Sequence, residues 1–238
     1  MNIALIGYGR MGKEIEKIAL ERGHRIVLKI DKNNIEDFKS NDFANNTDVA
    51  IEFSQPESAV NNYKECFKHS IPVVSGTTGW LSDFEEIKVL CENDNQTFFY
   101  ASNFSLGVNI FFEINKKLAA LINGVDGYEV DIEEIHHTKK LDEPSGTAIT
   151  LANQLVSELS TKEFWQLNGT ESKAVNIKAK RIADVPGTHI VKYESDIDQI
   201  TIEHKAKNRK GFALGAVLAA EFLQGKKGIY TMQDLLKL

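Results

Sequence analysis

The sequence is poor in the features that mark several protein classes. It has two cysteines among 238 residues, Cys66 and Cys91. That number is too small for a disulfide scaffold, so we expect both as small buried side chains in a reducing compartment. Acidic residues outnumber basic ones, 34 to 28. This balance argues against a nucleic-acid partner or an anionic membrane surface.

Long apolar runs and metal-ligand spacings are also missing. No weakly polar stretch reaches the ~18 residues of a membrane span, and the apolar run Ile3–Ile6 is too short for a signal peptide. Neither cysteine is spaced from another Cys or His as in a metal site, so we expect no metal. These absences predict a cytoplasmic protein with no membrane partner.

The first part of the chain alternates short apolar runs with helical patterns. The predicted strands begin near Ile3, Ile26, Val49, Val73 and Thr97, and helix-like segments follow the first, third and fourth of them. Strand, helix, strand is the right-handed parallel unit. The pattern predicts an α/β fold, a Rossmann-type doubly wound parallel sheet.

After about Ser105 the pattern changes to longer alternating strands, which predicts a second, smaller α+β domain built on an open mixed sheet. One face of such a sheet is left over, so we expect self-association through it. We expect a first domain over 1–105, completed by C-terminal helices within 209–238, and a second domain over 106–208.

A glycine-rich motif follows the first strand directly. It is a G-x-G-x-x-G that opens a helix, and its residues are Gly7, Tyr8, Gly9, Arg10, Met11 and Gly12. Asp31 ends the second strand, where its carboxylate can accept hydrogen bonds from a ribose diol. Glu14 follows Lys13, so the hydroxyl that a P-loop uses for magnesium is absent. The motif therefore predicts a dinucleotide rather than an NTP.

Three further loops follow later strands of this sheet. Their backbone amides, hydroxyls and amide side chains suit a nicotinamide and its ribose, because the carboxyl ends of parallel strands share one crevice. The predicted nucleotide-binding residues here are Phe53, Gly76, Thr77, Thr78, Ala101, Ser102, Asn103 and Phe104. For the loop that begins at Phe53, a plain tight turn remains an equal alternative.

The densest chemistry lies between Glu134 and Ala148. Two histidines and two lysines, His136, His137, Lys139 and Lys140, are followed by Ser-Gly-Thr at the start of a predicted helix. With Ser145 as N-cap, the next backbone amides can face an anion, and nearby cations favour a carboxylate. The alternative is a solvated basic loop before a capped helix.

This stretch resembles the signature of the dihydrodipicolinate reductase family, E-x-H-H-x-x-K-x-D-A-P-S-G-T-A. The resemblance continues through GTTG from Gly76, ASNFSLGVN from Ala101 and HKAKNRKGFALGA from His204. Two departures are Glu143 in place of the usual alanine and a glycine loop one residue shorter than in many relatives.

The resemblance implies reduction of 4-hydroxy-tetrahydrodipicolinate, a small cyclic dicarboxylate, with NADH or NADPH, in a homotetramer whose second domain binds the substrate. By position, His136 and Lys140 match the proton-donating residues. The family's substrate-binding residues correspond to His137, Lys140, Ser145, Gly146 and Thr147. Of the remaining histidines, His189 stays undecided.

Two other functions remain open from the residues alone. One is another two-domain NAD(P)-dependent amino-acid dehydrogenase, which would share the fold without needing the HHTKK and PSGT sequences. The other is a non-catalytic sensor of NAD(P)H. The sequence does not decide between NADH and NADPH, because Asp31 favours a free 2′-hydroxyl while Lys29 and Lys32 favour a 2′-phosphate.

Overall fold

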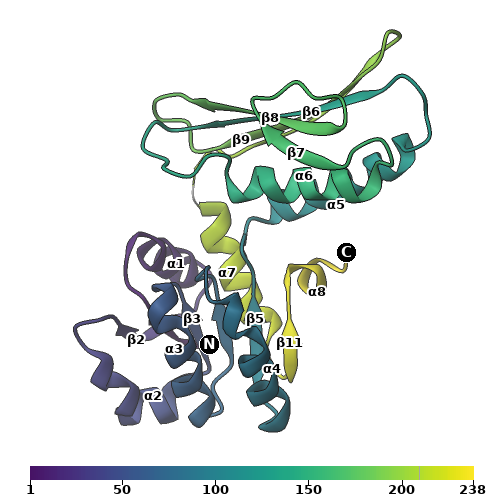
Figure 1. Ribbon diagram of the computed structural model, residues 1–238. Coiled ribbons are helices and arrows are strands. Elements are labelled where there is room, and N and C mark those ends of the chain that lie inside the picture. Colours follow the sequence, from purple (N-terminus) through teal and green to yellow (C-terminus); the bar gives the residue numbers. More distant parts are fainter. Residues whose placement is uncertain (209) are drawn as a thin grey trace. The chain divides into compact units, whose positions relative to one another are not determined.

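The computed structural model describes residues 1–208 and 210–238. Its contacts divide the chain into two units (Figure 1). The first comprises Met1–Leu106 and Lys210–Leu238, and the second comprises Gly107–Arg209. Each unit has a sheet and a core of its own, and each is described by itself.

The sheet of the first unit is parallel throughout, as predicted. Its six strands follow the order β11-β5-β4-β3-β1-β2. Their bounds are β1 Asn2–Ile6, β2 Arg25–Ile30, β3 Val49–Glu52, β4 Val73–Ser75, β5 Thr97–Tyr100 and β11 Gly228–Tyr230. The order reverses between β1 and β3, which is the point where ligands bind in open α/β sheets.

Helices cover both faces of this sheet because its strands are apolar on both sides. Ile3 and Leu5 of β1 face α1 and α7, while Ala4 and Ile6 face α3 and α4. The helices of the unit are α1 Arg10–Glu21, α2 Asn41–Asn46, α3 Pro56–Lys68, α4 Phe84–Asn93, α7 Lys210–Phe222 and α8 Met232–Leu236, with short 3₁₀ turns Ile35–Lys39 and Leu81–Asp83.

The second unit is built on a mixed sheet of five strands in the order β10-β9-β6-β8-β7. Strands β6, β8 and β7 are parallel to one another, whereas β9 and β10 are antiparallel neighbours. The bounds are β6 Glu129–His136, β7 Phe164–Leu167, β8 Ala174–Arg181, β9 Thr188–Glu194 and β10 Gln199–Lys205, with helices α5 Leu106–Ile122 and α6 Gly146–Glu158.

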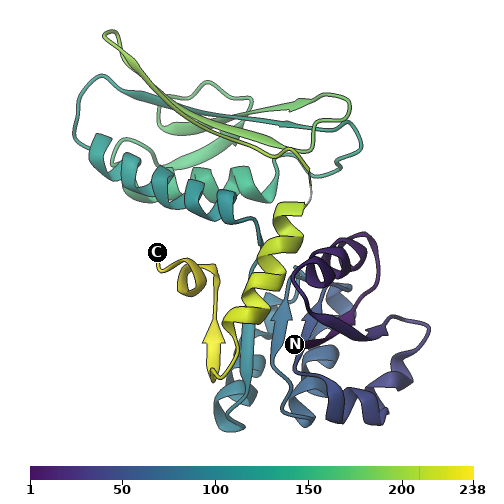
Figure 2. The ribbon, with the colours of Figure 1, turned by 180° about the vertical axis from the view of Figure 1, so that it is seen from behind.

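Both helices of the second unit lie against one face of its sheet, as the two opposite views show (Figures 1 and 2). Val130 and Ile132 of β6 pack there with Leu151 of α6. The other face carries no helix among the described residues, and ion pairs such as Asp131–Lys178 and Glu133–Lys180 lie on it. The prediction of a mixed sheet with one open face is confirmed.

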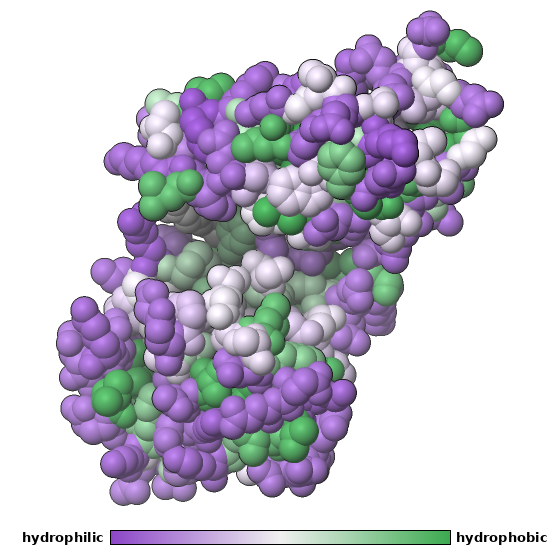
Figure 3. Space-filling view, viewed as in Figure 1, coloured by the Kyte–Doolittle hydropathy of each residue, from purple (hydrophilic) through white to green (hydrophobic). Residues whose placement is uncertain are grey.

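Two strands were not expected from the sequence. β7 and β11 are short, at four and three residues, and neither shows the long alternation that predicts a strand by itself. The predicted buried cysteines are confirmed, since Cys66 in α3 and Cys91 in α4 are both free and buried. Hydrophilic side chains predominate on the face seen in Figure 3, and no helix in the described chain could cross a membrane.

Candidate functional site

The glycine loop of the first unit has the conformation that its motif demands. Gly7 has a φ of +87°, and a Cβ built on it would lie 2.1 Å from the Phe53 carbonyl oxygen. A Cβ on Gly12 would lie 2.5 Å from the Gly7 oxygen. Gly9 is the N-cap of α1, and among the described residues no side chain caps this helix and no atom lies within 4 Å of a Cβ built on Gly9. The helix N-terminus therefore has open space for a phosphate.

Tyr8, within this loop, ties the second strand to the first helix. Its hydroxyl donates to Glu16 and accepts from Lys29 at 3.1 Å. Lys29 also pairs with Glu16 at 2.7 Å and lies 4.5 Å from the centre of the Tyr8 ring. Asp31 is exposed at the end of β2, where its Oδ1 accepts from the Lys32 amide. The charge of Lys29 is thus balanced locally.

A buried carboxyl lies beneath two of the predicted nucleotide loops. Glu52 ends β3 with no exposed surface. It accepts from the Ser54 amide at 3.1 Å and from the Thr77 hydroxyl at 3.0 Å, and the Ser54 hydroxyl also donates to it. Burial raises the pKa of the Glu52 carboxyl, and the hydrogen bonds only partly oppose this. Glu52 holds the loops after β3 and β4 together.

Aromatic packing joins these loops to the one after β5. A Cβ on Gly76 would lie 2.2 Å from the Phe53 ring, so any larger residue there would displace this ring. The Phe53 and Phe104 rings are 5.5 Å apart. Phe104 is buried in the core, so it offers a ligand only its backbone. The structure brings together the loops predicted for the nucleotide, although several of the side chains serve packing.

In the second unit, the inner face of β6 changes from apolar to polar along its length. Val130 and Ile132 are buried in the core, and Glu134 and His136 follow at the same two-residue spacing. Glu134 has no exposed surface and His136 is 7% exposed. The strand therefore delivers a carboxylate and an imidazole to the end of the core.

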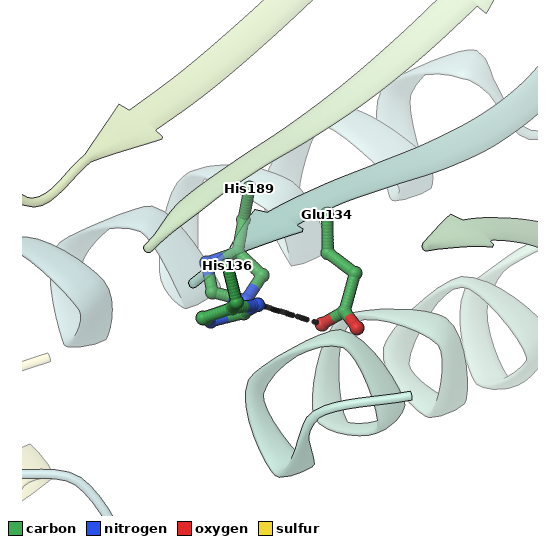
Figure 4. A group of neighbouring side chains, drawn as sticks. All are labelled: Glu134, His136 and His189. Atoms are coloured by element: carbon green, nitrogen blue, oxygen red, sulfur yellow. Dashed lines mark ion pairs between the residues drawn. The ribbon is translucent and has the colours of Figure 1, made fainter. Parts of the chain in front are cut away.

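The Glu134 carboxylate receives donors from several elements. The Ser145 amide donates to its two oxygens at 3.2 and 3.1 Å, and Arg181 Nη2 donates to Oε1 at 3.1 Å. Oε2 faces His136 Nδ1 at 3.5 Å and His189 Nε2 at 3.8 Å (Figure 4). One carboxylate thus ties the start of α6 to the end of β8 by hydrogen bonds and lies beside two imidazoles.

Helix α6 begins where the sequence predicts, with Ser145 as its N-cap. The Ser145 hydroxyl accepts from the Ala148 amide at 3.2 Å. Gly146 and Thr147 form the first turn, and a Cβ at Gly146 would meet no atom of residues 1–208 or 210–238 within 4 Å. Lys140 is half-buried and donates to Asp142 at 2.8 Å. The N-terminus of α6 therefore has room for an anion, with a lysine on the preceding loop.

Burial sets the charge states of the histidines here. It lowers the pKa of His136, against the attraction of the Glu134 carboxylate. It lowers the pKa of His189 to about 3, with repulsion from His136 and His204 acting in the same direction. Nδ1 of His136 and of His137 is buried without a hydrogen bond among the described residues. His189 is therefore a neutral imidazole at physiological pH.

The same cluster offers a metal-like arrangement, since Glu134, His136 and His189 present ligand atoms within 4.8 Å of one another. Arg181 and the Ser145 amide, however, already donate to this carboxylate. A divalent cation would lie next to a fixed guanidinium and a helix N-terminus, and both of these repel it. We interpret the cluster as a hydrogen-bond network beside an anion site.

Sequence reasoning missed Arg181, left His189 undecided and assigned no role to Glu134. Arg181 and His189 lie more than 30 residues beyond the motif, on strands that pair directly with β6. Glu134 is part of the motif, yet only its burial shows that it anchors the other groups. A charged residue on the apolar face of an alternating strand was the available signal for Glu134. Arg181 and His189 could be found only from the register in which their strands pair with β6, and the sequence does not display this register.

Comparison with known families gives matches over nearly the whole chain. Residues 1–104 match the family model described as dihydrodipicolinate reductase, N-terminus, and residues 107–236 match the one described as dihydrodipicolinate reductase, C-terminus. The 4-hydroxy-tetrahydrodipicolinate reductase of Christiangramia forsetii is 57% identical over 99% of this chain and 98% of its own. That of Caldanaerobacter subterraneus is 37% identical over 96% and 95%.

A solved structure shares the fold. The dipicolinate-bound dihydrodipicolinate reductase of a Paenisporosarcina species superposes with a TM-score of 0.81 at 20% identity, covering 98% of this chain and 99% of that one. At this identity the likeness concerns the architecture of the two units.

The neutral state of His189 predicts a pH dependence of stability. Its folded pKa of about 3 lies below the ordinary 6.5, so on acidification the unfolded chain takes up a proton that the folded chain does not. Stability is therefore lost as the pH falls below about 6.5. When the pH falls from about 7 to about 5, the unfolding free energy of the unmodified protein should decrease. The decrease for the His189→Gln variant should be smaller by about 2 kcal/mol. Urea unfolding at both pH values measures this, and parallel losses would show that His189 is charged in the fold.

Proposed function

The chain belongs to the dihydrodipicolinate reductase family, and we propose that its substrate site is the N-terminus of α6 with the end of β6 and the loop between them. The protein is a 4-hydroxy-tetrahydrodipicolinate reductase of diaminopimelate and lysine biosynthesis that uses NADH or NADPH. The main observation in support of this site is that the Glu134 carboxylate accepts a hydrogen bond from the Ser145 amide and faces His136.

The substrate's carboxylates set the requirements on this site. The residues proposed to hold them are His137, Lys140, Ser145, Gly146 and Thr147. The backbone amides of the first helical turn and the Lys140 ammonium favour a carboxylate electrostatically. Lys140 pairs with exposed Asp142, so a substrate carboxylate can compete with that partner for the ammonium.

The proton that follows hydride addition comes, in this proposal, from Lys140 or His136. Burial lowers the pKa of His136, so a neutral imidazole is favoured at physiological pH. The Lys140 ammonium carries three N–H donors, whereas a neutral imidazole carries one. We therefore propose Lys140 as the proton source and His136 as a hydrogen-bonding partner of the substrate.

The first unit fits a dinucleotide, because Gly7 and Gly12 make backbone contacts too close for a Cβ, while the space beside Gly9 at the N-terminus of α1 is open among the described residues. When bound, the nicotinamide supplies the hydride from its C4. We propose that Gly7 to Gly12 hold the pyrophosphate and Asp31 the adenosine ribose. The residues proposed for the nicotinamide half are Phe53, Gly76, Thr77, Thr78, Ala101, Ser102, Asn103 and Phe104.

The alternative functions left open by the residues lose support. Both halves of the chain match the reductase family, and full-length relatives carry that activity, so neither another amino-acid dehydrogenase nor a sensor is needed to explain the motifs. We also expect the enzyme to act in the cytoplasm, as the pathway of the family does.

Replacing Lys140 by Met tests the proton source, because the change keeps the apolar stem and removes the charge. We expect kcat to fall by ~10²–10⁴-fold, with the KM for NADH unchanged, since a general acid acts in the transition state. Steady-state kinetics with freshly prepared substrate measure both constants.

Lys139→Met is the matched control, since Lys139 is exposed and forms no ion pair with the described residues. It should lower kcat less than about threefold. Equal losses at both lysines would indicate a diffuse basic surface instead of a placed proton donor.

Asp31→Ala tests the ribose end of the nucleotide site. The carboxylate accepts from a free diol and repels a 2′-phosphate, so its loss should raise the KM for NADH and lower or preserve that for NADPH. Lys29 is paired with Glu16 and is not expected to change this outcome. Equal weakening of both cofactors would place Asp31 elsewhere.

We propose a homotetramer assembled through the open face of the second unit's sheet. That face carries half-exposed Ile135 and Ile190 among its ion pairs, and no helix of the described chain covers it. Light scattering should give about four times the 26.7 kDa chain mass, and a monomer at assay concentration would contradict the proposal.

A further inference from the structure

His189 lies in the network by virtue of strand register. In the antiparallel pairing of β6 with β9, Val130 is opposite Tyr193 and Ile132 is opposite Val191. The next pair on the same face is Glu134 with His189. Side chains of opposite residues are neighbours, so the apolar pairs of the core give way to a carboxylate–imidazole pair at its edge.

Three contacts define the environment of the His189 ring. Its Nε2 lies 3.1 Å from the Ser145 hydroxyl oxygen and 3.8 Å from Glu134 Oε2, and its ring packs edge-on against His136 at 5.0 Å (Figure 4). The side chain is only 6% exposed. The ring thus touches the carboxylate, the helix cap and the predicted acid-base histidine.

The charge on Glu134 decides which ring nitrogen of His189 carries the proton. A neutral imidazole has one N–H, and a carboxylate facing Nε2 favours the tautomer with the hydrogen there. The same nitrogen lies 3.1 Å from the Ser145 hydroxyl oxygen, so a hydrogen on Nε2 can be donated to that oxygen. Glu134 therefore makes His189 a donor to Ser145.

The Ser145 hydroxyl can then form one further hydrogen bond, as a donor. Its oxygen has two lone pairs and one hydrogen. One lone pair accepts the Ala148 amide as the helix cap, and the other accepts His189 Nε2–H. With both lone pairs used, the hydroxyl hydrogen can only be donated outward, and the neighbouring first turn of α6 attracts anions.

We propose that His189 is a positioning residue that fixes the Ser145 hydroxyl as a hydrogen-bond donor to a carboxylate of the substrate. The proposal rests on the substrate site proposed above. Without His189 Nε2–H, the hydroxyl is free to rotate, and its hydrogen is no longer directed at the ligand. His189 itself touches neither substrate nor cofactor in this arrangement.

The test compares substitutions of His189 that differ in one donor. His189→Phe keeps the ring and its packing against His136 but has no N–H. His189→Gln places an amide nitrogen near the position of Nε2, whereas His189→Asn is too short to do so. The measurements are the KM for the substrate, the inhibition constant of dipicolinate as a planar dicarboxylate probe, the KM for NADH and the pH profile of kcat.

We expect His189→Phe to raise the substrate KM and the dipicolinate inhibition constant by roughly tenfold to 150-fold, the effect of one hydrogen bond to a charged group. His189→Gln should stay within about threefold of the unmodified enzyme. The KM for NADH and the pH profile should not move. If the Phe variant does not fold, His189→Asn takes its place in the comparison with Gln.

Ser145→Ala completes a double-mutant cycle. Because His189 acts through the Ser145 hydroxyl, His189→Phe should have no further effect on dipicolinate inhibition once that hydroxyl is removed. An additive effect, or a Gln variant as weak as the Phe variant, would overturn the positioning role. A separate result concerns the substrate site itself: if Ser145→Ala alone leaves both constants unchanged, the site assignment fails, whatever His189 does.

Discussion

A carboxylate without exposed surface organises the second unit. Glu134 stands where the inner face of β6 leaves the apolar core, and burying its charge is unfavourable unless strong donors surround it. The Ser145 amide and Arg181 supply those donors, and each comes from a different element. Satisfying this one charge therefore fixes the start of α6 relative to β6 and β8, which positions the proposed anion site.

The first unit uses a related device with different partners. Glu52 is also fully buried at the end of a strand, below the loops that follow β3 and β4. Its donors are hydroxyls, amides and Asn62, and no lysine or arginine of the described residues pairs with it. Burial accordingly raises the pKa of Glu52. In both units a buried carboxyl at a strand end holds loops that the sequence marks as ligand-binding.

The two histidines of the network illustrate how one charge produces different roles. His136 presents Nδ1 toward Glu134 and follows it by two residues on the same strand, so the motif itself brings them together. His189 reaches the same carboxylate from β9, and burial keeps it neutral. A neutral imidazole beside a carboxylate is a tautomer-defined donor, which is more useful for orienting a hydroxyl than for transferring a proton.

The sequence by itself determined the fold class, the parallel sheet whose first strand leads into the glycine loop, and Ser145 as the N-cap of a helix. It also displayed the motif from His136 to Thr147. Periodicity, caps and close glycine turns are local, so they can be read from neighbouring residues. Only the tertiary structure decided that Arg181 and His189 join Glu134, that Lys29 is neutralised by Glu16, and that the short strands β7 and β11 exist. These depend on strand register and on contacts between distant segments, which cooperative packing sets and local sequence does not encode.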